Sequence, residues 1–155
     1  MNKVWIVIAN ARMSTIYSVS PKNHHFNLVK TLFHAEDQHQ KNSDLTSDGP
    51  GHYQKGRTSL RGSYEETNHK ELETERFAQH ICQELEHGRT TNAYQSLIVI
   101  AEPRFYGHIN THAGRHVQPL IKYHLAKDYT HFSTKKLKEE LEKLLAHEIR
   151  LLMIS

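Results

Sequence analysis

The 155-residue chain has little cysteine, little proline and no long apolar run. Cys82 is the only cysteine, which excludes an intrachain disulfide and suits a reducing compartment. No run approaches the roughly 20 apolar residues that cross a bilayer, and the apolar opening is too short for a secretory signal. These absences predict a soluble, cytoplasmic protein without membrane insertion.

Charge and length narrow the class of protein further. The net charge of +3 with neutral histidines permits an anionic partner but does not require one. Fourteen histidines would make the chain more basic on mild acidification. A length of 155 residues fits one domain with a substantial core, and no repeat or linker divides it. We therefore predict a single domain over residues 1–155, while its oligomeric state stays open.

Hydrophobic patterning predicts an α/β fold whose mixed sheet opens with a three-stranded antiparallel meander, with helices packed on the sheet. The predicted elements are strands over 4–9, 13–19 and 26–33, a helix over about 68–86, a strand over 96–101, a short helix over about 105–113, a helical turn over 117–120, a strand over 121–126 and a final helix from 133 or 134. A long polar loop fills about 34–67.

Several single residues carry local predictions. Asn10 lies in the first turn and is expected to adopt the left-handed conformation. Gly88 is expected to end the long helix, and Gly114 to break the short one. Cys82 falls on the apolar stripe of the long helix, which favours a core thiol over a nucleophile.

The polar loop contains the most distinctive stretch, residues 47–64. It holds four of the seven glycines, and no acidic residue occurs from position 49 to 64. Its basic residues are Lys55, Arg57 and Arg61. Because compact domains rarely keep so long a connection without a use, the loop is the first place to look for function.

Three interpretations of this loop stay open from the residues alone. As an RNA contact, the three basic side chains would neutralise phosphates and Tyr53 would stack on a base. As a catalytic loop, Gln54 or His52 would position or activate a water, although neither is a strong candidate. The third interpretation is a solvated loop without a ligand. The loop lacks the Gly-Lys-Ser/Thr pattern of a nucleotide-phosphate loop.

Other polar residues define smaller candidates. His108, His112 and His116 recur at metal-ligand spacing, but Ile109 stands where a zinc protease needs Glu, so we predict neither a metal site nor a cofactor. Arg104 follows a strand end, a common binding position in α/β sheets, and is predicted to contact RNA. The first four strands contain no carboxylate, which argues against metal-dependent nuclease chemistry.

Three segments resemble the bacterial host-attachment protein family: V-W-I-V-I-A-N-A-R-M-S-T-I-Y at the start, L-I-V-I-A-E-P-R-F-Y-G in the middle, and K-D-Y-T before the last helix. The resemblance covers nearly the whole chain, and A-x-P-R-F-x-G at 101–107 is its most specific part. The family in turn is similar to the central domain of archaeo-eukaryotic peptide-release factors. The resemblance thus implies a ribonuclease-H-like fold and a ribosome or structured RNA as partner.

In release factors, the loop after the third strand carries a Gly-Gly-Gln tripeptide, whereas Gln54 here follows His52 and Tyr53. That departure favours a non-catalytic RNA- or ribosome-associated module over an enzyme. Two alternatives remain: a residual hydrolase acting on an RNA ester such as peptidyl-tRNA, and a protein-interaction factor that contributes indirectly to attachment to host cells.

Overall fold

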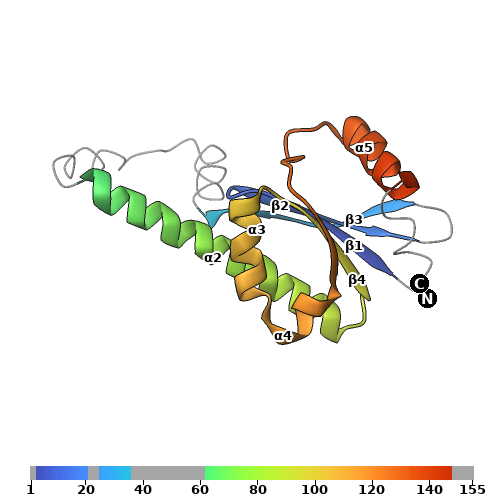
Figure 1. The fold of residues 1–155 in the computed structure, drawn as a ribbon, viewed down its shortest axis with the longest axis horizontal. Helices are drawn as coiled ribbons and strands as arrows, with labels where there is room; N and C mark the ends of the chain where they lie inside the picture. Colours follow the sequence, from blue (N-terminus) through green and yellow to red (C-terminus); the bar gives the residue numbers. More distant parts are fainter. Residues whose placement is uncertain (1–2, 21–24, 36–61, 148–155) are drawn as a thin grey trace, which may run out of the picture.

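The computed structural model describes residues 3–20, 25–35 and 62–147, where five strands form one sheet with helices on both faces (Figure 1). The strands are β1 (Val4–Ala9), β2 (Met13–Val19), β3 (Phe26–Phe33), β4 (Ser96–Ile100) and β5 (Ile121–Leu125). The helices are α2 (Gly62–Thr90), α3 (Pro103–His112), α4 (Gly114–Val117), the 3-10 turn η2 (Gln118–Leu120) and α5 (Thr134–His147).

The strand order in the sheet is β3-β2-β1-β4-β5. β2 pairs antiparallel with both β1 and β3, whereas β4 pairs parallel with β1 and with β5. The opening meander and the mixed α/β sheet are therefore confirmed. Because β1, β3, β4 and β5 all run the same way, their carboxyl ends lie at one edge of the sheet.

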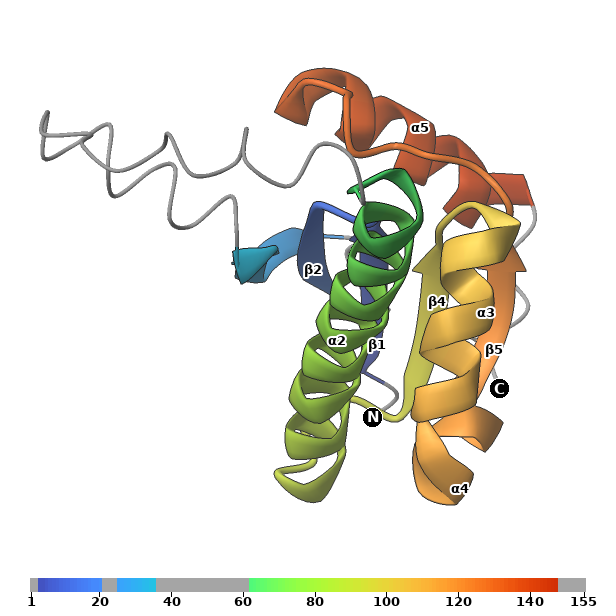
Figure 2. The ribbon, with the colours of Figure 1, turned by 90° about the vertical axis from the view of Figure 1, so that its left-hand side faces the viewer.

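The central strands are apolar throughout because both of their faces are covered. Every residue of β1 is buried, as is every residue of β4 after Ser96. Alternate β1 residues face opposite sides: Trp5 and Val7 belong to the core beneath α2 and α3, and Ile6 and Ile8 to the core beneath α5. Figure 2 shows α2 and α3 side by side across one face of the sheet.

The long helix differs from its predicted bounds of 68–86. It begins at Gly62, so positions 62–67, which we predicted to be loop, have helical backbone, while residues 36–61 lie outside the described residues. Gly88 does not end the helix, which runs on to Thr90. The left-handed residue that follows is Asn92, with φ 57°. Gly88 is instead a packing position, where the absence of a side chain makes room for the Trp5 ring.

The remaining helices follow the sequence pattern more closely. The backbone N–H of Lys136 donates to Ser133 Oγ at 3.2 Å, which caps the start of α5 where we predicted it. Leu137, Leu141 and Leu145 recur at helical spacing and form the buried stripe of that helix. Gly114 has φ +80° and separates α3 from α4, confirming the expected break. No helix within the described ranges is both long and apolar enough to cross a membrane.

Candidate functional site

A cavity of about 340 Å³ opens between α2 and α3 at the carboxyl edge of the sheet. At this edge the connection that follows β1 runs to β2 on one side of the sheet, whereas the connection that follows β4 runs to β5 on the opposite side. In open α/β sheets, ligands usually bind where neighbouring connections diverge in this way. The cavity is lined by Asn10, Ala11, Lys70, Glu71, Thr74, Glu102, Arg104, Phe105 and His108. Its wall carries cations and carboxylates together, and its volume lies in the range of small-ligand pockets.

Arg104 lies in the first turn of α3, just beyond β4, as the sequence predicted. Its guanidinium forms an ion pair with Glu71 of α2, and the Arg104 side chain is 81% exposed. The next residue, Phe105, is buried, and its ring lies 6.1 Å from the Phe77 ring, centroid to centroid. Phe105 thus packs into the core, and Arg104 is placed at the rim of the cavity with a partner on the facing helix.

The polar loop connects to this same edge of the sheet. The described chain stops after Ala35, two residues beyond the end of β3, and resumes at the start of α2. The other predicted site residues all lie outside the described residues, namely His52, Tyr53, Gln54, Lys55, Arg57 and Arg61. Their predicted roles stay predictions, but the sheet edge from which their segment departs is the one that carries Arg104.

Asn10 joins two distant parts of the chain at this edge. Its Nδ2 donates to Thr130 Oγ1 at 2.8 Å and contacts Asp128 Oδ2 at 3.5 Å. Its Oδ1 accepts the backbone N–H groups of Arg12 and Met13 at 2.8 and 2.9 Å. The predicted left-handed backbone at Asn10 is wrong, since Asn92 is the only non-glycine residue with positive φ among those described. The Asn10 side chain closes the turn, so the backbone needs no unusual conformation.

Two further contacts hold the ends of β4 and β5 together. The backbone N–H of Ala101 donates to the carbonyl of Leu125 at 3.1 Å. His124 Nε2 lies 2.9 Å from the Ala101 carbonyl oxygen, an acceptor, so this nitrogen carries the proton. The His124 ring stacks on Tyr106 at 3.6 Å between centroids, fixing α3 against β5. The three segments with family resemblance thus converge at one edge of the sheet.

Asp128 is the charged residue among the groups that contact Asn10. Burial by itself would raise the pKa of its carboxyl, but hydrogen bonds from the Thr130 hydroxyl and backbone and from Asn10, with His131 nearby, outweigh burial and hold that pKa below its ordinary value. The Thr130 hydroxyl and backbone N–H donate to Asp128 Oδ1 at 2.5 and 2.9 Å. The ionised carboxylate therefore stabilises the folded state.

A pH-dependent loss of stability is expected to trace to Asp128. Because its pKa is lowered on folding, its contribution is complete above the ordinary value of 3.8 and is lost as pH falls through the lower folded value. In urea unfolding from pH 7 to pH 2.5, wild type should exceed Asp128→Asn in stability at neutral pH, with the difference shrinking below about pH 4. Thr130→Val should make this pH dependence shallower. A wild-type advantage that stays constant down to pH 2.5 would contradict the assignment.

The three regularly spaced histidines do not share one role. His108 lines the sheet-edge cavity, whereas His112 Nε2 lies 2.9 Å from Glu75 Oε1 on α2. His116 lies beyond the break at Gly114. Among the described residues, no three His, Cys, Asp or Glu side chains gather closely enough to hold a metal ion.

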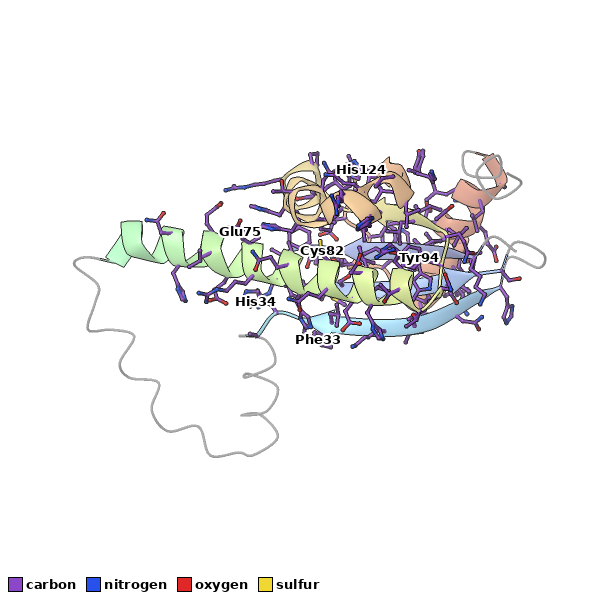
Figure 3. All side chains as sticks on the ribbon, turned by 90° about the horizontal axis from the view of Figure 1, so that it is seen from below. Phe33, His34, Glu75, Cys82, Tyr94 and His124 are labelled. Carbon is purple, nitrogen blue, oxygen red and sulfur yellow. The ribbon has the colours of Figure 1, made fainter. Side chains whose placement is uncertain are left out.

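Cys82 lies on the buried side of α2 (Figure 3). Its thiol donates to the Ile109 carbonyl at 3.3 Å, and burial raises its pKa to about 12. A thiol with so high a pKa is a poor nucleophile at neutral pH, so the prediction of a core cysteine is confirmed.

A family model described as "Protein required for attachment to host cells" matches residues 5–141, from the second residue of β1 through the other four strands and into α5. No curated protein matches the chain. The matched range spans all three converging segments at the sheet edge.

Proposed function

This chain belongs to the family of proteins required for attachment to host cells, and we propose that it acts as a non-catalytic RNA- or ribosome-associated module in the cytoplasm. One observation carries the proposal. The segment with Lys55, Arg57 and Arg61 departs from the edge of the sheet where Arg104 and Lys70 line a cavity. A basic, glycine-rich sequence in the connection that follows this edge suits a phosphate backbone.

We propose further that the fold is the ribonuclease-H-like arrangement of the release-factor central domain. The strand order β3-β2-β1-β4-β5 with β2 alone reversed supports this, as does the position of the long polar connection between β3 and α2. A fold does not bring its chemistry with it, however. Here β1 to β4 lack carboxylates, and His52 and Tyr53 stand where release factors have two glycines before Gln54. These departures favour binding over hydrolysis.

Ribosome co-sedimentation across a salt series tests the proposal. Wild type should co-sediment at low salt and dissociate as salt rises, because phosphate contacts release counterions. Changing Lys55, Arg57 and Arg61 together to Ala should reduce the slope of log affinity against log salt by about 2, since each lost phosphate contact removes roughly 0.7. Arg104→Ala should weaken association less than the triple change, because its guanidinium is already paired with Glu71.

A charge-matched control comes from three exposed lysines elsewhere on the fold, Lys122, Lys138 and Lys143. Changed together to Ala, they remove the same net charge but should leave the salt slope within experimental error of wild type. If the two triple variants lose association equally, only net charge matters and the loop is not the contact. If wild type never co-sediments at low salt, the proposal fails and a protein partner becomes the leading explanation.

A further inference from the structure

Basic side chains lie at both ends of α3 and on the short helix α4 that follows the break at Gly114. Arg104, His108, His112 and His116 follow one another at intervals of four residues, and Arg115 lies beside the last. On α3 two of these side chains already face carboxylates of α2, since Arg104 pairs with Glu71 and His112 lies against Glu75. Arg104 and His108 line the sheet-edge cavity, and Arg115 and His116 lie at the other end of the helix pair.

At that other end, a second and larger groove of about 510 Å³ lies between α2 and α4. It is lined by Gln79, Cys82, Gln83, Glu86, His112, Ala113, Gly114, Arg115 and His116. Figure 3 shows Glu75 and Cys82 along α2, the helix that forms one wall. Gln79 and Gln83 are exposed and lie one turn apart on this wall, so both can offer amide N–H groups to a ligand.

The charges around the groove leave a surplus of donors. Glu86 is paired with Arg89 at 2.5 Å and also lies close enough to His116 to interact with it electrostatically, and Glu75 lies against His112. Both nearby carboxylates are thus already opposed by a basic side chain. Arg115 is exposed and has no ion-pair partner within the described part of the chain. The side chains left to meet a ligand are therefore mainly donors, which suits an anion.

We propose that the groove between α2 and α4 is a second RNA-backbone site, where Arg115 and His116 bind a phosphate and Gln79 and Gln83 donate to its neighbours. Basic side chains lie at both ends of α3, with Arg104 and His108 at the sheet-edge cavity and Arg115 and His116 at this groove. An extended polyanionic strand would meet both ends, whereas an isolated phosphate would meet only one. This inference deepens the proposed function and rests on it for the identity of the partner.

Amide and histidine-ring NMR signals test the inference with a 5′-phosphorylated octauridylate as probe. The titration uses full-length protein in which Lys55, Arg57 and Arg61 are already Ala, so that loop binding does not contribute. Signals of residues 112–116 should shift, and an octamer with an uncharged methylphosphonate backbone should leave them in place. Arg115→Ala should raise the Kd about tenfold, because a charge-assisted hydrogen bond to phosphate is lost. Arg76→Ala is the matched control, since Arg76 is exposed and pairs with Glu73, and its Kd should change less than twofold.

The possible outcomes separate this inference from the proposed function. If the loop variant shows no shift at 112–116 while wild type still binds ribosomes, the groove is not a site and the proposed function stands. If the groove signals shift although wild type never co-sediments with ribosomes, the groove binds RNA and the ribosomal role is wrong. Equal Kd values for Arg115→Ala and Arg76→Ala would overturn the inference, as would a phosphoserine peptide that binds the groove more tightly than the octamer.

Discussion

Replacing Gly88 with alanine is expected to destabilise the protein by about 2 kcal/mol. An added Cβ would lie 2.5 and 2.6 Å from Cη2 and Cζ3 of Trp5, and 2.9 Å from Cε1 of Tyr94. Neither ring can move away easily. The Trp5 and Tyr94 rings pack at 4.8 Å between centroids, and the Tyr94 hydroxyl donates to the buried Leu85 carbonyl at 2.6 Å. Overpacking of this kind costs about 3 kcal/mol, and better helix propensity recovers about 1.

Gly107→Ala makes the same chemical change in the middle of α3 and is the matched control. An added Cβ there would meet nothing within 4 Å. Helix propensity alone should then act, giving a gain of about 0.5–1 kcal/mol. Thermal unfolding should lower the Tm of Gly88→Ala by roughly 4–8 °C and raise that of Gly107→Ala by a few degrees. Equal shifts in the two variants would show that the helix–strand contact at Gly88 is not tight.

Asn10→Ala is expected to cost about 2–3 kcal/mol, a large effect for one polar residue in a turn. The change removes the acceptor of two backbone N–H groups and the donor to Thr130. It also releases the chain after β5 from the turn after β1, so the wall of the cavity that Asn10 lines should loosen. Urea unfolding measures the stability, and hydrogen exchange at Thr130 reports the local release.

Two further variants make the Asn10 prediction specific. Asn27→Ala on the exposed edge strand β3 should change stability by less than about 0.5 kcal/mol. Asn10→Asp keeps an acceptor for the turn but places a second carboxylate beside Asp128 Oδ2, now 3.5 Å from Asn10 Nδ2. The loss of stability of Asn10→Asp relative to wild type should become smaller from pH 7 to pH 5, since one of the two adjacent carboxyls takes up a proton. A deficit in Asn10→Asp that does not change with pH would argue against close contact with Asp128.

Some residues of the candidate site could be predicted from the neighbouring sequence, whereas the roles of others depend on partners far away in the chain. Arg104 could be predicted, because a basic residue after a continuous apolar strand indicates the carboxyl edge of a sheet. Its ion pair with Glu71, 33 residues away, has no local signal. The role of Asn10 was missed for the same reason, since its partners lie 118 and 120 residues further on. The K-D-Y-T segment was the available hint, because Asp128 and Thr130 are its polar members.

The sequence by itself determined the elements, the mixed sheet and the central strands. A run such as Val4–Ala9, apolar at every position, fits only a strand covered on both faces, and Leu137, Leu141 and Leu145 fix the buried side of α5. Only the tertiary structure decided the order of the strands and the meaning of Gly88. Local propensity favours ending a helix at glycine, but packing against Trp5 outweighs that preference and keeps α2 helical to Thr90. The packing energy comes from contacts between residues far apart in the chain, and no short stretch of sequence contains both partners.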